Sequence, residues 1–318
     1  MAKVVFITGA TGLLGLPTLN EFTSRSDWHV VGTGFDRVDD DSLIKLDLTD
    51  FQAVTKSIIQ VQPSIIIHTA GERSLEVSQQ DIEYTEKLNV AVTLHLAELS
   101  KNLDIPLIYI SSDYVFDGTK PPYEPDDVPN PSNEYGELKL RGERAALDTN
   151  PKAIVLRLPV LYGATEYESE SAINCLIDVV MNREQKLQAV IDDWQLLYPT
   201  NTTDTARVIY EIAGTLILQA MIKSLTKTER SIAGQLTPQI LHFSADQRFT
   251  KYAICVILGE ILCVPITHLV RQNTAPTMGV KLPYNCKLSV HLLETVGIDI
   301  ASVDFQTWFR KYLLPRRR

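Results

Sequence analysis

The chain has 318 residues, of which 45% are hydrophobic and 22% charged, so it is long enough for one large core and a smaller appended region. The net charge of -9 and the isoelectric point near 5.2 exclude nucleic acid and anionic membranes as general partners. The basic end, Arg316–Arg318, would contact an acidic partner or form a solvated tail.

The cysteines and histidines indicate neither a metal site nor a disulfide framework. Cys175, Cys255, Cys263 and Cys286 show no C-x-x-C spacing, and the six histidines do not cluster with them. No apolar run approaches the roughly eighteen residues of a membrane span, and no signal-peptide pattern precedes the first strand. We therefore expect a soluble cytoplasmic protein that does not bind membranes. A nuclear location is kept as a second possibility.

The first predicted strand begins at Lys3 and passes into a turn with three glycines, Gly9, Gly12 and Gly15, which opens a helical pattern. A strand, a glycine turn and a helix N-terminus together present backbone N–H groups and a positive dipole end to a pyrophosphate. The alternative is a tight turn that only packs a helix on a sheet. The G-x-x-G-x-x-G spacing is typical of short-chain dehydrogenase/reductases.

Strand-like and helical runs then alternate, which predicts a Rossmann-type doubly wound parallel sheet of the α/β class. The predicted strands are Val4–Thr8, His29–Thr33, Ser64–Thr69, Leu107–Ser111 and Ala153–Leu158, and the helices between them include Phe51–Val61, Ile82–Lys101 and Glu134–Leu147.

After about Leu161 the alternation stops, which divides the chain into a dinucleotide-binding domain, 1–160, and a smaller C-terminal α/β substrate-side domain, 161–318, interleaved by crossovers. A polar excursion is expected at Lys223–Gly234. The second region is expected to contain helices at Ala172–Asn182, Asp204–Lys223, Thr250–Leu262 and Lys287–Val296 and a short strand near Leu241–Ser244.

The residues after the second strand bear on the choice of dinucleotide. Asp36 stands about twenty residues after the glycine turn, where a carboxylate accepts from the ribose 2′-hydroxyl of NAD. Arg37 could instead bind the 2′-phosphate of NADP. We favour NADP(H) and leave NAD(H) open. Asp47 and Leu48 follow a further short strand and would flank the adenine, although Asp47 could instead cap the helix Phe51–Val61.

Tyr135 and Lys139 are four residues apart, which places both side chains on one face of a helix. An ammonium near a phenol lowers the pKa of the phenol, so this tyrosine could exchange a proton with a carbonyl or alcohol. Ser112, or its neighbour Ser111, ends the preceding strand and could hydrogen-bond a substrate oxygen. These residues predict a Ser/Tyr/Lys catalytic set.

The set of glycines, Ser112, Tyr135 and Lys139 resembles the extended short-chain dehydrogenase/reductases. The stretches Tyr109–Gly118, Pro131–Gly136 and Lys139–Glu143 resemble dTDP-4-dehydrorhamnose reductases and the related family of methionine adenosyltransferase regulatory beta subunits. The second family is favoured by the stretches Thr8–Gly15, His68–Arg73, Leu156–Gly163 and Phe243–Tyr252.

The resemblance implies NADP(H) as cofactor and the catalytic methionine adenosyltransferase subunit as partner. It assigns Thr11, Gly12, Leu13 and Leu14 to the pyrophosphate, Phe35 and Arg37 to the adenosine phosphate, Asp47 and Leu48 to the adenine, Thr69 and Arg73 to positions beyond the fourth strand, and Tyr135, Lys139 and Leu161 to the nicotinamide side.

Three features differ from that family: Asp36 replaces an arginine, Lys223–Gly234 is longer, and the end Arg310–Arg318 lacks an aromatic terminus. The main hypothesis is an NADP(H)-binding regulatory subunit, which would modulate S-adenosylmethionine synthesis. One alternative is an NADPH-dependent reductase of a nucleotide-linked 4-keto-6-deoxysugar, and another is a reductase of a small carbonyl compound.

Overall fold

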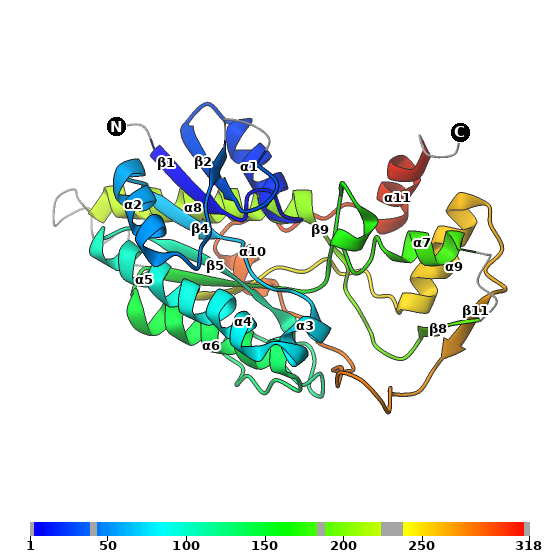
Figure 1. The fold of residues 1–318 in the computed structure, drawn as a ribbon. Helices are drawn as coiled ribbons and strands as arrows, with labels where there is room; N and C mark the ends of the chain where they lie inside the picture. The colour runs from blue at the N-terminus through cyan, green and yellow to red at the C-terminus, as the bar shows by residue number, and fades with distance from the viewer. Residues whose placement is uncertain (1–2, 39–42, 183–187, 224–237, 315–318) are drawn as a thin grey trace.

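The computed structural model describes residues 3–38, 43–182, 188–223 and 238–314 of the chain. Within these residues, seven parallel strands form a central sheet in the order β3-β2-β1-β4-β5-β6-β10, with helices on both faces (Figure 1). The predicted Rossmann-type doubly wound fold is confirmed. The strands are β1 Lys3–Thr8, β2 Trp28–Gly34, β3 Leu43–Lys45, β4 Ile65–His68, β5 Leu107–Ser112, β6 Ala153–Leu158 and β10 Ile240–His242.

Two layers of helices explain why the central strands are apolar along their whole length. All residues of β4 and β6 are buried, because helices cover both faces of the sheet. One face packs against α1 Gly15–Thr23, α8 Thr202–Lys223 and α10 His291–Thr295. The other face packs against α2 Phe51–Val61, α5 Val92–Asn102 and α6 Glu134–Thr149.

A second hydrophobic core forms the smaller lobe on the right of Figure 1. Its main contacts are among aromatic and aliphatic side chains of Tyr162, Ile254, Phe305 and Phe309. The elements of this lobe are α7 Leu176–Met181, α9 Lys251–Leu262, α11 Phe305–Leu313, the strand pair β8 Ala189–Asp192 and β11 Leu269–Gln272, and the strand pair β7 Leu161–Tyr162 and β9 Thr200–Asn201.

The chain crosses between the two cores more than once. Strand β10 and helix α8 come from the predicted second domain, yet β10 pairs with β6 and α8 packs under the central sheet. The division into 1–160 and 161–318 therefore stays a prediction. The predicted excursion Lys223–Gly234 falls almost entirely, and the basic end Arg316–Arg318 entirely, outside the described residues.

Several helix predictions need correction. The helix expected at Ala172–Asn182 is only α7, and the one expected at Lys287–Val296 is only α10. The helix expected at Ile82–Lys101 is divided into α4 Ile82–Glu86, the π-helical turn Lys87–Ala91 and α5. The sequence reasoning missed the short α3 Leu75–Gln80 and also α11, although Phe305, Phe309 and Leu313 repeat at helical spacing.

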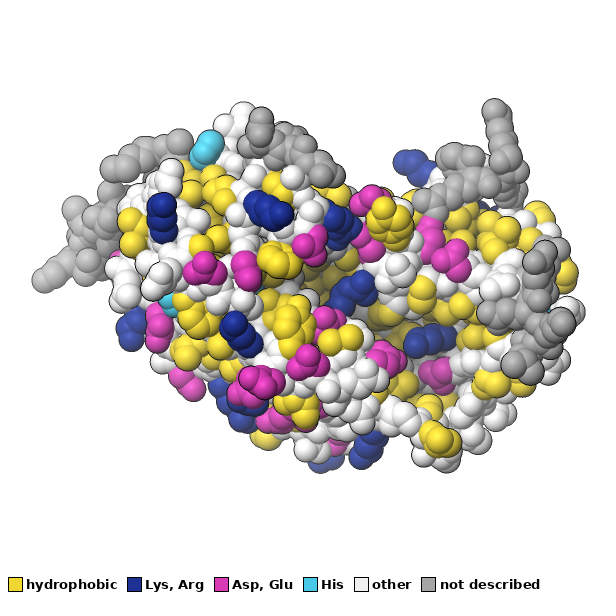
Figure 2. All heavy atoms as spheres, viewed as in Figure 1, with side chains coloured by type: hydrophobic (Ala, Val, Ile, Leu, Met, Phe, Trp, Pro, Cys, Tyr) yellow, Lys and Arg dark blue, Asp and Glu magenta, His cyan; other side chains and the backbone are white. Residues whose placement is uncertain are grey.

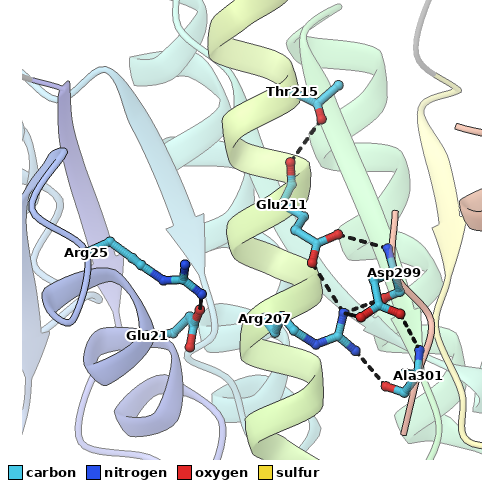
Figure 3. A network of polar contacts seen from close by, with 7 residues as sticks. All are labelled: Glu21, Arg25, Arg207, Glu211, Thr215, Asp299 and Ala301. Carbon is cyan, nitrogen blue, oxygen red and sulfur yellow. Dashed lines mark hydrogen bonds and ion pairs between the residues drawn. The ribbon is translucent and has the colours of Figure 1, made fainter. Parts of the chain in front are cut away.

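Arg207 of α8 joins the central helix layer to the segment that leads into α11 (Figure 3). Its guanidinium donates to the backbone oxygens of Asp299 and Ala301, each at 2.6 Å, and contacts the carboxylate of Glu211 at 3.3 Å. Glu211 in turn accepts from the backbone N–H of Asp299 at 2.9 Å. This network fixes the chain between the two lobes.

We expect Arg207→Ala to lower the free energy of unfolding by about 1–2 kcal/mol, because two backbone carbonyls lose a charged donor. Arg25→Ala is the comparison variant, since the half-exposed Arg25 contacts the Glu21 carboxylate and the Tyr210 ring but donates to no described backbone oxygen with its side chain. We expect a smaller loss there, below about 1 kcal/mol. Urea denaturation of both variants is the measurement, and equal effects would contradict a bridging role for Arg207.

Candidate dinucleotide-binding site

A cleft of about 480 Å³ opens at the carboxyl ends of β1, β4, β5 and β6, beside the smaller lobe. The strand order reverses between β1 and β4, and such a reversal is where doubly wound folds bind ligands. Figure 2 shows the molecule hollowed between its two lobes. Predicted site residues in the lining are Gly9, Thr11, Gly12, Leu13, Leu14, Gly15, Phe35, Arg37, Thr69, Arg73, Ser112, Tyr135, Lys139 and Leu161.

Close backbone packing requires glycine at two positions of the turn after β1. Gly9 has φ of +67°, and a Cβ there would lie 2.9 Å from the backbone of Ala70. A Cβ on Gly15 would lie 1.9 Å from the backbone oxygen of Gly9. The turn therefore brings the start of α1 directly against β1 and β4.

The space around Gly12 is more open than that around Gly9 and Gly15, and it would fit a bound phosphate. Gly12 lines the cleft, and beyond its chain neighbours the one described atom that a Cβ on it would meet within 4 Å is the backbone oxygen of Gly9, at 3.3 Å. Helix α1 begins beside it, Leu14 at its N-cap provides no side-chain cap, and the N–H of Leu16 donates to the backbone oxygen of Gly12. The N–H groups that can meet a ligand are therefore those between Gly12 and Leu16. The cradle thus has the open approach and donors that a pyrophosphate needs.

At the end of the cleft that follows β2, Arg37 forms ion pairs with two carboxylates from the segment after β7. Its guanidinium contacts Glu170 and lies 3.7 Å from Glu166. Phe35 is 56% exposed and, with Asp36, lines the cleft beside Arg37. The sequence predicted Arg37 in this position, but it provided no signal for its carboxylate partners, which lie more than 120 residues away.

Asp47 and Leu48 are not part of the cleft lining. The Asp47 carboxylate accepts from the backbone N–H and the hydroxyl of Thr49, each at 2.8 Å, and Leu48 is buried in the core under α2. The alternative that Asp47 caps the helix is wrong, because Asp50 accepts from the first N–H groups of α2. The adenine role of Asp47 and Leu48 stays a prediction.

Two further predicted residues lie where β4 ends. The Thr69 hydroxyl donates to the backbone oxygen of Thr8 at 2.7 Å, which ties β4 to the glycine turn. The Arg73 guanidinium donates to the backbone oxygen of Ser169 at 3.3 Å. Both residues line the cleft, and Arg73 thus also contacts the segment that carries Glu166 and Glu170.

Asn133 caps α6 by accepting from the backbone N–H of Gly136 at 2.9 Å, and this cap brings Tyr135 into the first helical turn. Burial raises the pKa of Tyr135 to about 12, while a hydrogen bond with Ser112 acts in the opposite direction. The expectation that Lys139 lowers this pKa is therefore corrected: burial is the largest influence on it, and the groups that lower it are Ser112 and Arg73.

Lys139 is buried and donates to the backbone oxygen of Ile110 at 2.6 Å, with its ammonium 4.4 Å from the centre of the Tyr109 ring. Burial lowers the pKa of Lys139 to about 7, and the carboxylate of Glu143 opposes that shift. The ammonium thus points to the end of β5 and is held near its titration point at neutral pH.

The two candidate serines have different partners. Ser111 donates to the buried carboxylate of Glu143 at 2.6 Å, whereas Ser112 contacts Asp113 at 3.2 Å and Tyr135. This favours Ser112 for a role beside the phenol. The sequence reasoning missed Asp113, which also lines the cleft; burial raises the pKa of its carboxyl to about 7.

Among the described residues, no group of three or more His, Cys, Asp or Glu side chains is placed to hold a metal ion. No helix in the described part of the chain combines the length and apolar character of a membrane span.

The fold and the cleft define a dinucleotide-binding protein of the short-chain dehydrogenase/reductase type. The chain matches the RmlD substrate binding domain family over residues 2–303. It is 38% identical to methionine adenosyltransferase 2 subunit beta of Mus musculus over 314 residues, covering 99% of this chain and 88% of that protein. It is 30% identical over 307 residues to a dTDP-4-dehydrorhamnose reductase of Aggregatibacter actinomycetemcomitans, covering 94% and 95% of the two chains.

Solved structures agree on the fold. A dTDP-4-dehydrorhamnose reductase of Bacillus anthracis in complex with NADP superposes with a TM-score of 0.77 at 19% identity, covering 99% of both chains. A UDP-glucose 4-epimerase of Thermus thermophilus in complex with NAD gives a TM-score of 0.73 at 17% identity, covering 96% of both. The chain belongs to the RmlD-like family that includes the beta subunits of methionine adenosyltransferase 2.

Proposed function

We propose that this protein is an NADP(H)-binding regulatory subunit of methionine adenosyltransferase, which modulates the synthesis of S-adenosylmethionine. The observation that carries the proposal is 38% identity to a beta subunit across 99% of the chain. The proposed partner is the catalytic methionine adenosyltransferase subunit. The proposed location is the cytoplasm, with the nucleus as the alternative.

A nicotinamide dinucleotide is the cofactor class that the cleft and the structural neighbours support. We favour NADP(H) because Arg37 lines the cleft just after β2, where a guanidinium would bind a 2′-phosphate. The N–H groups around Gly12 would hold the pyrophosphate, and Lys139 and Leu161 would line the nicotinamide side. When bound, such a cofactor supplies or accepts a hydride.

The reductase alternative rests on one observation, which is that Ser112, Tyr135 and Lys139 all line the same cleft. In that role Tyr135 would deliver a proton to a substrate oxygen, and Ser112 would hold that oxygen. Two features oppose it. Burial holds the proton on Tyr135 tightly, and the nearest acceptor of the Lys139 ammonium is a backbone oxygen.

The test of the proposed function is affinity purification of the tagged full chain from its native source, followed by a binding measurement with the purified catalytic subunit. Recovery of a methionine adenosyltransferase and a saturable complex would support the regulatory function. Rapid NADPH oxidation with a nucleotide 4-keto sugar, without any complex, would replace it by the reductase.

We expect Tyr135→Phe to leave the affinity for the catalytic subunit unchanged, because Tyr135 lines the cleft. In a reductase the same change would lower turnover by about a hundredfold or more, since a positioned proton donor typically contributes that much. Surface plasmon resonance and NADPH oxidation, measured on wild type and variant, separate the two. A large loss of partner affinity would contradict a role of Tyr135 confined to the cleft.

A further inference from the structure

The segment Thr165–Glu170 lies against the adenosine end of the cleft and contacts both arginines there. Glu170 and Glu166 form ion pairs with Arg37, and the backbone oxygen of Ser169 accepts from Arg73. The backbone N–H of Glu166 donates to the Glu170 carboxylate at 3.2 Å, so the two ends of this segment are also held together. We call Thr165–Glu170 the strap.

The strap is anchored in the smaller lobe by a different carboxylate. Glu168 accepts from the side-chain amide of Asn174 at 3.2 Å and from the hydroxyl of Tyr312, on α11, at 3.4 Å. Tyr312 also lies 3.3 Å from the hydroxyl of Thr165. Glu168 therefore faces the smaller lobe, whereas Glu166 and Glu170 face Arg37.

Arg37 carries the charge that a 2′-phosphate would need, and the strap already neutralises it. A guanidinium binds carboxylate and phosphate with the same planar donors, so the two anions compete for one set of N–H groups. The Glu170 side chain is only 16% exposed, which reduces the screening of this ion pair by water. Asp36 adds a further carboxylate to the same end of the cleft.

We propose that Glu170, with Glu166 as a weaker second, competes with the 2′-phosphate of the cofactor for Arg37, so that binding of a 2′-phosphorylated dinucleotide releases the strap. Glu170 is then a specificity-determining residue that lowers the preference for NADP(H) over NAD(H). This inference rests on the proposed binding of a nicotinamide dinucleotide. It adds the carboxylates that a 2′-phosphate would have to displace from Arg37.

The test uses two nucleotides that differ only in the phosphate concerned, 2′,5′-ADP and 5′-AMP, with affinities measured by calorimetry on the full chain. We expect Glu170→Gln to bind 2′,5′-ADP about five- to tenfold more tightly than wild type, with unchanged affinity for 5′-AMP. Glu168→Gln is the matched control, because it removes the same charge from the strap while leaving the contacts of Arg37 in place. We expect it to bind both nucleotides like wild type.

Arg37→Ala tests whether the effect passes through this guanidinium. We expect it to lose most of the preference for 2′,5′-ADP over 5′-AMP, and we expect Glu170→Gln to have no further effect in the Arg37→Ala background. Amide hydrogen exchange provides an independent readout. In wild type, 2′,5′-ADP should accelerate exchange at Glu170 and Ser171. Their N–H groups donate to the backbone oxygens of Tyr167 and Glu168 of the strap, so release of the strap would expose them.

Equal gains in affinity for Glu168→Gln and Glu170→Gln would overturn the proposal, because they would show a diffuse effect of charge. Unchanged affinity of Glu170→Gln for 2′,5′-ADP would overturn it as well, while leaving the proposed cofactor in place. Absence of binding of either nucleotide to wild type would remove the proposed cofactor together with this inference.

Discussion

Gly12→Asp is expected to abolish the binding of NADPH. The new carboxylate would stand beside the N–H groups of the cradle, in the open space where a pyrophosphate fits. Like charges in contact cost several kcal/mol, which corresponds to a loss of affinity of at least about a hundredfold. Calorimetric titration of the purified variant with NADPH is the measurement.

Gly214→Asp is the matched control for this experiment. Gly214 lies in α8, and apart from its chain neighbours and the backbone of its own helix, no atom of the described residues lies within 4 Å of a Cβ built on it. The control introduces the same side chain away from the cleft, so we expect wild-type affinity for NADPH. An unchanged affinity in Gly12→Asp itself would remove the cradle assignment.

Glu143→Ala should lower the free energy of unfolding by about 3–5 kcal/mol, because it leaves a buried guanidinium without its counter-charge. The side chains of Glu143 and Arg157 are 2% and 1% exposed and form two parallel hydrogen bonds of 2.8 Å. Ser111 would also lose the acceptor for its hydroxyl. Urea denaturation, followed by circular dichroism, measures the change.

The double replacement Glu143→Leu with Arg157→Met separates the cost of an unpaired charge from the value of the pair itself. We expect it to recover much of the stability lost in Glu143→Ala, since apolar side chains of similar volume often replace a buried ion pair at little cost. A Glu143→Ala variant within about 1 kcal/mol of wild type would show that the partners Arg157 keeps, the backbone oxygen of Pro125 and the His242 ring, each at 3.3 Å, are enough to hold the guanidinium.

The sequence predicted the site residues whose positions are set by the strand or helix that carries them and by the strand just before it. The glycine turn, Thr69 after β4 and Tyr135 with Lys139 on α6 all line the cleft. The glycine turn and Thr69 directly follow strands whose continuous apolar runs identify them, whereas Tyr135 and Lys139 lie on the helix that follows β5. Parallel strands bring their carboxyl ends to one edge of the sheet. Asp47 also follows a strand, but it forms a local turn with Thr49.

The sequence by itself determined the alternation of strands and helices, the glycine turn and the family, because burial on both faces and helical spacing are recorded in neighbouring residues. Only the tertiary structure decided which strands pair and which groups these residues contact. It placed β10 beside β6, held Lys139 against Ile110 and brought Glu170 to Arg37 across 133 positions of sequence. The contact between Glu170 and Arg37 depends on how the smaller lobe packs beside the central sheet, and residue spacing carries no record of that packing.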